Sequence, residues 1–428
     1  MKFYLLTTSA LCLLASCTTQ KDPLKGTRED FIASGTLKPC PLLKDKIVMS
    51  TYPKSVNQWP VSDKNLSHLQ LDIEAPKASK FLWDTSIGKG LASGLSLMPN
   101  MVANSTHVFT MDTSGNISSI NQKDGKAAWS TLPSKQLDNT LAGGLAIEND
   151  TLIATSSSGD ITGISTTDGK QLWQVNVESP IRIGATTHAG KAYILTVSNE
   201  LMTIDIATGK ILWQHQGINE FSAILGGANP AVSGSTVIAA YSSGEYYALN
   251  TSTGDVLWSD TLTAALRSDT VSSITHIVAS PVINDNTVYV MSHGGKMVAT
   301  DIKTGNRNWQ QNIGGIKTPL VVGDFIFVVS DLDELICMDK KTGKPKYSVN
   351  LRAYNATDSA LKLNFSAPLL VSGEILITTS NGELLYLSRQ DGKLLKSYAT
   401  DQKVQNGPII VNGNYFLLSN DGTLNAYK

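Results

Sequence analysis

Short runs of apolar and β-branched residues alternate with polar, glycine-containing turns along most of the chain. In one such unit, residues 237–241 predict a strand, residues 242–244 a turn and residues 245–250 the next strand. A Thr-Gly turn then leads into a further strand that carries Trp258. Glycine suits these turns because it adopts the positive φ that tight hairpins require. The pattern therefore predicts consecutive antiparallel strands.

The turn before the last strand of each unit belongs to a recurring motif, Thr/Asp-Gly-Lys-x-x-Trp, in which Lys is replaced in two copies. The motif glycines, including two degenerate copies at the end, are Gly125, Gly169, Gly209, Gly254, Gly305, Gly343 and Gly392. Tyr347 and Lys396 stand in place of Trp in the degenerate copies. The seven glycines span 267 residues in six steps, about 44 residues each. A period of ~40–50 residues with strand-like content indicates the four-stranded blades of a β-propeller.

One large aromatic residue falls at the same place in the last strand of each unit except the copy at Gly392. A large apolar ring placed once per repeat favours packing between neighbouring blades over a ligand site. The residues expected to have this structural role are Trp83, Trp129, Trp173, Trp213, Trp258, Trp309 and Tyr347.

The two ends of the repeat region complement each other. Residues 419–428 complete one inner strand and end before any Trp-bearing strand appears. That missing strand is present in residues 79–85, so we expect the N-terminal segment to supply the outermost strand of the last blade and remove an exposed sheet edge. Eight units over residues 78–428 again average about 44 residues. The predicted fold is all-β, an eight-bladed propeller of four-stranded antiparallel blades.

Composition narrows the class of protein further. The chain has 428 residues, a length that would allow two or three domains. The repeat indicates instead that one ring accounts for most of this length. Its 35 basic and 36 acidic residues balance, and no basic cluster provides the positive patch that a nucleic-acid partner requires. The apolar content of 41% can supply a sizeable core, which argues against disorder.

The N-terminus has the features of a targeting signal. Residues 1–16 place one positive charge before an apolar run that is too short to span a bilayer. Residues 14–17, Leu-Ala-Ser-Cys, resemble the bacterial lipobox, which predicts lipid attachment at Cys17; a plain signal peptide with an incidental cysteine is the alternative. In enteric bacteria Asp after this cysteine retains a lipoprotein in the inner membrane, so Thr18 favours the outer membrane.

Residues 17–77 are expected to form a lipid-anchored tether and lead-in to the propeller domain at 78–428. Residues 18–48 carry scattered charges, three prolines and no hydrophobic period, which is typical of a flexible tether. Once the signal is removed and Cys17 is acylated, two cysteines remain, Cys40 and Cys337. Two unpaired thiols are the expected state, although an oxidising envelope would permit a disulfide between them.

The sequence contains little that predicts catalysis. The six histidines lack metal-ligand spacing, and no nucleophile or phosphate-binding motif occurs. Residues 331–334, Asp-Leu-Asp-Glu, resemble a calcium cluster but occupy a turn position of the repeat, where acidic residues are common. We therefore expect no enzyme activity, no metal, no cofactor and no small-molecule substrate.

The spacing of the repeats identifies candidate recognition loops. The motif glycines lie 51 residues apart across Gly254–Gly305 and 49 apart across Gly343–Gly392, against 38 between Gly305 and Gly343. The extra length falls in residues 260–280 and 350–367, and long loops on a rigid ring commonly carry recognition. A tolerated surface insertion is the alternative. The first loop contains Arg267, Asp269 and His276 among apolar residues, which suits a protein partner.

Several segments in order resemble one family over essentially the whole chain. They are residues 57–60 (Asn-Gln-Trp-Pro), 83–90, 225–230 (Leu-Gly-Gly-Ala-Asn-Pro) and 279–282 (Ala-Ser-Pro-Val), together with the lipobox. These features resemble the BamB family, lipoproteins of the outer-membrane β-barrel assembly machinery. The resemblance implies a non-enzymatic scaffold, anchored to the outer membrane with its propeller in the periplasm.

The resemblance also implies a partner and a docking surface. Members of the family dock on a periplasmic domain of the barrel-inserting subunit through loops that match residues 218–230 and 262–281 here. Ile224 and Leu225 stand where enteric members carry an apolar residue and an Arg that contact the partner. His276 and Val278 stand where those members carry an acidic pair, so this chain departs from the family pattern at its contacts.

Two other functions remain open from the sequence. The Gly-x-x-x-Trp repeat also resembles pyrroloquinoline-quinone dehydrogenases, although this chain lacks adjacent cysteines and a Cys-x-x-Cys-His haem motif. A generic envelope propeller that binds a ligand such as carbohydrate is the second alternative. Quinone absorbance would distinguish the first, and crosslinking to an assembly subunit the second.

Overall fold

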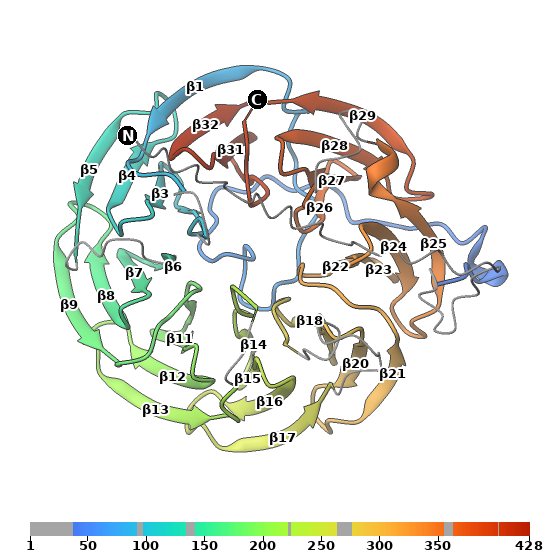
Figure 1. The fold of residues 1–428 in the computed structure, drawn as a ribbon, viewed down its shortest axis with the longest axis horizontal. Helices are drawn as coiled ribbons and strands as arrows, with labels where there is room; N and C mark the ends of the chain where they lie inside the picture. Colours follow the sequence, from blue (N-terminus) through green and yellow to red (C-terminus); the bar gives the residue numbers. More distant parts are fainter. Residues whose placement is uncertain are drawn as a thin grey trace, which may run out of the picture. The chain divides into compact units, whose positions relative to one another are not determined.

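The structure, a computed structural model, describes residues 37–91, 97–133, 142–220, 224–262, 276–354, 363–400 and 402–428. The chain separates into two compact units, Met1–Gly35 and Thr36–Lys428. The first unit, with Cys17, lies outside the described residues. In the second unit the described strands form eight four-stranded antiparallel sheets arranged as the blades of a ring (Figure 1). The predicted eight-bladed propeller is confirmed.

Each blade runs from an inner strand at the channel to an outer strand at the rim. Blades 1 to 4 consist of β2 (Val102–Ala103), β3 (His107–Met111), β4 (Ile117–Asn121) and β5 (Ala127–Thr131); β6 (Ala142–Glu148), β7 (Thr151–Ser156), β8 (Asp160–Ser165) and β9 (Gln171–Asn176); β10 (Thr186–His188), β11 (Lys191–Leu195), β12 (Glu200–Asp205) and β13 (Ile211–Gln216); and β14 (Ala231–Ser233), β15 (Thr236–Ala240), β16 (Glu245–Asn250) and β17 (Val256–Thr261).

Blades 5 to 7 repeat this order, and blade 8 takes its outer strand from the N-terminal side. They consist of β18 (Val282–Asn284), β19 (Thr287–Met291), β20 (Met297–Asp301) and β21 (Arg307–Gln311); β22 (Leu320–Val322), β23 (Phe325–Val329), β24 (Glu334–Asp339) and β25 (Pro345–Asn350); β26 (Leu369–Val371), β27 (Glu374–Thr378), β28 (Glu383–Ser388) and β29 (Leu394–Ala399); and β30 (Ile409–Val411), β31 (Asn414–Leu418), β32 (Thr423–Tyr427) and β1 (Phe81–Ser86). Two short 3-10 helices are η1 (Pro41–Leu43) and η2 (Leu351–Tyr354).

The ring closes in blade 8 by pairing of the two ends of the repeat region. β1 lies antiparallel to β32, with the register running from Phe81 opposite Tyr427 to Ser86 opposite Thr423. This is the closure expected from the sequence. It gives β32 a partner on the side that would otherwise be an open sheet edge.

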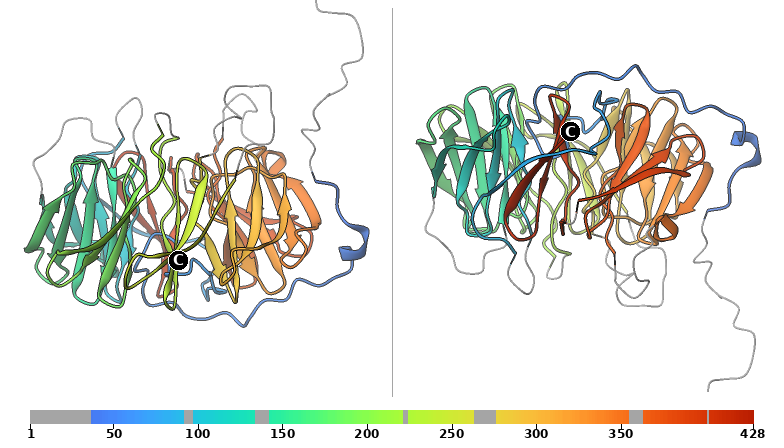
Figure 2. Two further views of the ribbon diagram at one scale, coloured as in Figure 1. Left: turned by 90° about the horizontal axis from the view of Figure 1, so that it is seen from below. Right: turned by 90° about the horizontal axis from the view of Figure 1, so that it is seen from above.

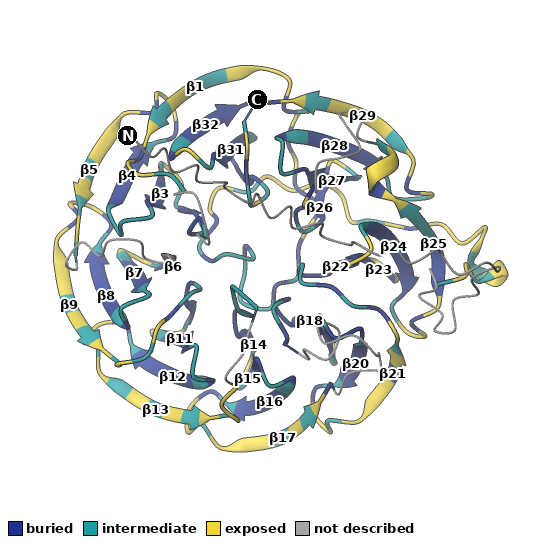
Figure 3. Ribbon diagram, viewed as in Figure 1, coloured by how far each residue is buried: buried dark blue, intermediate teal, exposed yellow. Residues whose placement is uncertain are grey.

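The core lies between the faces of neighbouring blades. The second and third strands of the blades are almost entirely buried, whereas the outer strands expose alternate residues (Figure 3). Between blades 4 and 5, for example, Ile238 and Tyr246 pack in one cluster with Val290 and Val298. Strands buried on both faces explain why the sequence reads as apolar runs rather than strict alternation.

The aromatic residue of every outer strand except β29 packs against the motif glycine of the next blade. A Cβ on Gly254 would lie 2.7 Å from the ring of Trp213, and the φ of this glycine is +78°. The Trp213 indole N–H also donates to the carbonyl of Thr251, 3.2 Å away. The same arrangement joins Trp83, Trp129, Trp173, Trp258 and Trp309 to the following blade, and the Tyr347 hydroxyl donates to the carbonyl of Arg389 at 3.1 Å.

Residues 48–77, here called the belt, run across one face of the ring and occupy its centre (Figures 1 and 2). Their backbone pairs with inner strands of widely separated blades. Trp59 forms an antiparallel bridge with Ala103 of blade 1, and Ile73 a parallel bridge with Val371 of blade 7. Leu66 accepts a backbone hydrogen bond of 2.6 Å from Val232 of blade 4.

The belt therefore differs from the connector that we expected before residue 78. Backbone N–H and C=O groups on the inner strands face the channel without a neighbouring strand, and the belt pairs with several of them. Its apolar side chains Trp59, Val61 and Ile73 are at most 3% exposed, so they belong to the core of the ring. The residues from Cys40 onward also contact blade 6, where the Cys40 N–H donates to the carbonyl of Pro345 at 2.7 Å.

Cys40 and Cys337 are both free thiols, as expected. Cys337 is buried in β24, and burial raises the pKa of its thiol above the ordinary value. Among the described residues, no helix has the length and apolar character required to cross a membrane.

Candidate functional site: the central channel and the loops around it

The inner strands surround a central channel that the belt closes at one face. The cavity that remains has a volume of about 810 Å³. Its wall includes residues that precede inner strands, such as 182–184 and 316–318, and its floor includes Trp59, Asp63 and Gln70 of the belt. Concave sites of this size are where propellers and other folds bind ligands or partner segments.

The channel wall carries charged side chains of both signs. Nδ1 of His293 lies 3.1 Å from Oδ2 of Asp331, and Arg352 pairs with Asp333 at 2.6 Å. The cations Arg182 and Lys317 also line the wall, and burial lowers the pKa of Lys317. The acidic run 331–334 thus forms a hairpin turn whose aspartates face basic partners. No cluster of three or more potential metal ligands occurs in the described part of the chain.

Two connections between blades come together beside the channel. One leads into blade 4 and the other into blade 5. The Ile224 N–H donates to Nδ1 of His276 at 2.9 Å, which links them directly. Gly226 lies against Val278, with a Cβ built on the glycine 3.4 Å from that side chain, and its φ of +106° is one that other residues rarely adopt. The described ends of the two loops, residues 224–230 and 276–281, are therefore neighbours in the structure.

His276 acts as a buried link rather than as an exposed contact. Its side chain is only 4% exposed, and burial lowers its pKa to about 4, with smaller contributions from the charges of His293 and Arg182. The imidazole is therefore neutral at pH 7. A neutral ring whose Nδ1 accepts from Ile224 must carry its proton on Nε2.

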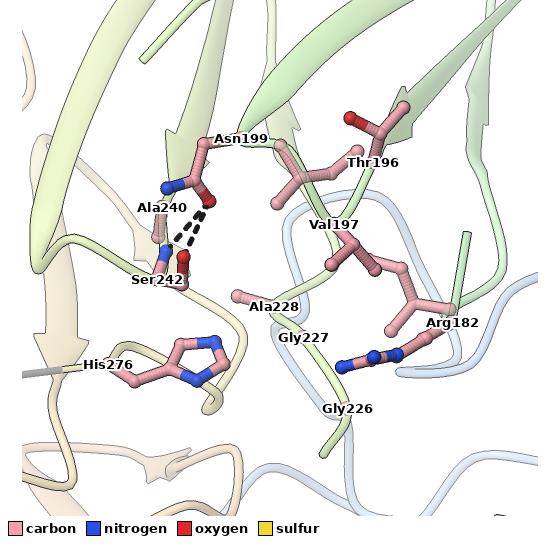
Figure 4. A pocket seen from close by; sticks show the side chains of 12 residues that line it. Arg182, Thr196, Val197, Asn199, Gly226, Gly227, Ala228, Ala240, Ser242 and His276 are labelled. Carbon is pink, nitrogen blue, oxygen red and sulfur yellow. Dashed lines mark hydrogen bonds between the residues drawn. The ribbon is translucent and has the colours of Figure 1, made fainter. Parts of the chain in front are cut away.

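A small enclosed pocket lies beneath these connections (Figure 4). Its volume of about 20 Å³ has room for roughly one water molecule. Arg182 and His276 extend into it from different sides, past the backbone of Gly226 and Gly227. At one end, Oδ1 of Asn199 accepts hydrogen bonds from the N–H and hydroxyl of Ser242, at 3.0 and 2.9 Å.

The belt supports the same connections from below. The Asn229 N–H donates to the hydroxyl oxygen of Ser280 at 3.1 Å, and its side-chain amide donates to Oδ2 of Asp63 at 3.1 Å. His68 of the belt has Nδ1 2.7 Å from the carbonyl of Pro281. Contacts from the belt thus reach both connections and fix their lower ends.

The candidate contact residues have different positions in the structure. Ile224 and Leu225 are half-buried at the rim of the channel, and Leu225 lines its cavity. Arg267 and Asp269 lie outside the described residues. Arg182 was not among the residues expected from the sequence; it lies four residues before the inner strand of blade 3, as Val278 does before that of blade 5. Aligning the repeats at this position would have found it.

The comparisons with known proteins agree with this architecture. The family model described as outer membrane protein assembly factor BamB matches residues 113–348, more than half of the chain. The chain belongs to the BamB family. Its BamB relatives include the outer membrane protein assembly factor BamB of Yersinia pestis, 21% identical over 409 residues, covering 93% of this chain and 97% of that protein. BamB of Salmonella typhimurium is 24% identical over 357 residues, covering 81% of this chain and 88% of that protein.

Solved structures share the fold at low identity. BamB from Moraxella catarrhalis superimposes with a TM-score of 0.67 at 19% identity, covering 81% of this chain and all of that one. A europium-containing methanol dehydrogenase has a TM-score of 0.69 at 12% identity, covering 84% of this chain and 89% of that one. The BamB fold is therefore shared with enzymes, and these similarities alone assign no activity.

Proposed function

We propose that this BamB-family protein is a non-enzymatic scaffold of the outer-membrane β-barrel assembly complex. It docks through the connections between blades onto a periplasmic domain of the barrel-inserting subunit and assists insertion of outer-membrane proteins. The observation that carries the proposal is the direct link between two of these connections, from the Ile224 N–H to His276 Nδ1 at 2.9 Å. Family membership and the names of the relatives support the same function.

The described ends of the linked connections suit protein docking because they are held in place before the partner arrives. Backbone and side-chain hydrogen bonds to the ring and belt remove the ordering cost that a mobile loop would incur on binding. Ile218 lies close to this surface with its side chain 59% exposed, and its N–H donates to Oε2 of Glu245 at 3.1 Å. An exposed apolar residue on a fixed backbone is a suitable anchor for a partner pocket. Arg267 and Asp269 belong to the same proposed surface.

We further propose that the mature protein is lipidated at Cys17 and resides at the outer membrane with its propeller in the periplasm. Two or three acyl chains would anchor it stably because a single chain gives only marginal binding. Cys17→Ser is expected to move a large share of the protein from the membrane fraction to the soluble periplasm. Retention of Cys17→Ser in the membrane by itself would show that another contact is sufficient.

In-cell photo-crosslinking tests the docking proposal. A crosslinking residue at position 218, 224 or 225 is expected to capture the barrel-inserting subunit. Asp285 is a matched control because its side chain is 79% exposed in the turn between β18 and β19, at the other end of these strands from the connection that leads into blade 5. His276→Ala is expected to lower capture from position 224 without abolishing the fold, since it removes the link between the connections. Equal capture from position 285, or none from the three test positions, would contradict the proposal.

The dehydrogenase neighbours favour a second test of the central cavity, because quinoproteins share this fold. The purified protein is expected to show no tightly bound quinone absorbance and no calcium-dependent dye reduction. The presence of both would replace the scaffold function by an enzymatic one.

A further inference from the structure

The most exposed large apolar side chains of the described chain lie within eleven residues of one another. Leu42, Ile47, Met49 and Tyr52 are 87%, 65%, 66% and 91% exposed, and no other large apolar residue among those described exceeds 59%. We call these four residues the apolar strip. Single exposed apolar residues are ordinary on protein surfaces, but a group of this exposure indicates a contact with something else.

The strip is held against the ring rather than extending freely into solvent. Between its members, Val48 is fully buried and its N–H donates to Oε1 of Gln390 at 2.9 Å. Nζ of Lys46 lies 2.8 Å from Oδ2 of Asp339 and 5.2 Å above the ring of Phe325. The backbone of this segment is thereby fixed on blades 6 and 7, while the side chains of the strip stay exposed.

Lysines surround the strip. The turn before β25 reads Lys-Lys-Thr-Gly-Lys-Pro-Lys over residues 340–346, and it is joined to the strip through the Lys46–Asp339 pair. The exposed lysines in the strip and this turn are Lys38, Lys44, Lys54, Lys341 and Lys344. The exposed carboxylates near them are Asp45, Glu74, Asp324 and Asp285, and Asp285 is paired with Lys340 at 3.6 Å. Asp339 is likewise paired with Lys46, so the surface around the apolar strip has a small excess of lysines.

We propose that the apolar strip and its lysines form a membrane-contact site that binds the surface of an anionic phospholipid bilayer. The apolar side chains enter the headgroup region, where the amphipathic ring of Tyr52 is favoured, and the lysines attract the lipid phosphates. Each lysine near an anionic surface contributes about 1 kcal/mol, so several together supplement a small apolar contact.

The position of the site in the chain supports this occupant. Leu42 lies 25 residues after Cys17, and an extended chain of that length spans at most about 90 Å. Lipidation at Cys17 would therefore keep the strip close to a bilayer. The strip packs beside the β22–β23 and β24–β25 turns, through Met49 at Gly323 and Lys46 at Asp339, and these turns lie at the opposite end of the strands from the connections between blades. The membrane and a docked protein can thus be bound at the same time, and neither contact requires the other.

Vesicle cosedimentation tests the proposal with the chain that begins at residue 17 and carries Cys17→Ser, so that no acyl chain contributes. It is expected to bind vesicles of phosphatidylethanolamine and phosphatidylglycerol but not vesicles of phosphatidylcholine alone. Leu42→Ser with Tyr52→Ser, and separately Lys341→Gln with Lys344→Gln, are each expected to weaken binding at least about fivefold, equivalent to about 1 kcal/mol. Leu172→Ser with Leu257→Ser removes two apolar residues that are 53% and 51% exposed elsewhere on the ring and is expected to have no effect.

Every test residue is exposed, so the variants are expected to retain the circular dichroism spectrum and unfolding midpoint of the parent. Binding that is unchanged in both variant pairs overturns the proposal. Dimerisation of the parent in sedimentation velocity, lost in the Leu42 and Tyr52 variant and without vesicle binding, would also overturn it by assigning the strip to a second copy. The crosslinking result from positions 218, 224 and 225 is independent of all these outcomes.

Discussion

The motif glycine and the aromatic residue of the preceding blade form one structural unit repeated around the ring. The glycine must adopt positive φ to turn the chain, and it must lack a side chain because the ring lies against it. Lys396 is the exception at the aromatic position, and the closure of the ring explains why no aromatic residue is needed there. Blade 8 takes β32 and β1 from opposite ends of the repeat region, so it has no turn glycine against which an aromatic residue in β29 could pack.

Substitution of one motif glycine tests this coupling. In Gly254→Ala the new Cβ would lie 2.7 Å from the Trp213 ring at a φ of +78°, so we expect a loss of unfolding free energy of about 2–4 kcal/mol. Gly234→Ala is the matched control, because its φ is +55° and no atom lies within 4 Å of the added Cβ. It is expected to cost about 1 kcal/mol from backbone strain alone. Urea unfolding measures both, and equal losses would show that the contact with Trp213 has no role.

At the scale of elements, the blades could be predicted from the sequence but the belt could not. Each blade is encoded locally, because strands, turns and the Gly-x-x-x-Trp motif recur within about 44 residues. The belt has no period, and its buried residues Trp59 and Ile73 are positioned by inner strands more than 40 and almost 300 residues away. For the candidate site, the resemblance placed Ile224 and His276 together, whereas Asp63 was missed because its contact with Asn229 depends on the path of the belt.

The belt contains a lysine whose burial opposes folding. Lys64 is 7% exposed, and burial lowers its pKa to about 8, partly offset by the charge of Asp72. This folded-state pKa is below the ordinary value of 10.5, so the buried charge lowers the free energy of unfolding. The loss is complete below pH 8 and decreases as the pH rises to 10.5. Lys64→Met is therefore expected to raise the unfolding free energy at pH 7 by about 1–3 kcal/mol.

Thermal unfolding as a function of pH distinguishes this cause from a packing effect. The advantage of Lys64→Met over the parent is expected to shrink between pH 8 and 10.5 as the amine of the folded parent loses its proton. Lys54→Met replaces an exposed lysine of the belt and is expected to change stability by less than about 0.5 kcal/mol at any pH. An advantage of Lys64→Met that stays constant with pH would rule out the charge as its source.

At the scale of the whole molecule, stability depends on the junction between β1 and β32. This closure was predictable because the C-terminal unit lacks a strand that the N-terminal side supplies. Trp83 joins it to blade 1 through a 3.1 Å hydrogen bond from its indole N–H to the carbonyl of Gln122. Blade 8 is therefore joined to blade 1 by the contact that recurs around the ring, and to blade 7 by a different one, between the hydroxyls of Tyr386 and Tyr415 at 3.2 Å.

Hydrogen exchange measures whether this junction opens before the rest. Residues 81–86 and 423–427 are expected to exchange as slowly as β16, since both ends are paired within a closed ring. Trp83→Ala is expected to speed exchange in both segments together. Trp213→Ala, which removes the equivalent contact between blades 3 and 4, should not act selectively on them. Faster exchange of β1 and β32 than of β16 in the parent would show that this junction opens locally before the rest of the ring.

The belt also sets an order of events during biogenesis. It precedes every blade in the chain, so it is synthesised before any of them. Its hydrogen-bond acceptors and donors, however, lie on inner strands from blade 1 to blade 8. The belt can therefore form all of its hydrogen bonds only after the last strand has been synthesised. A docked belt thus indicates a complete ring. An unfinished or misassembled chain would leave this segment undocked and accessible to proteases, so the same residues that close the channel can serve as a checkpoint for quality control.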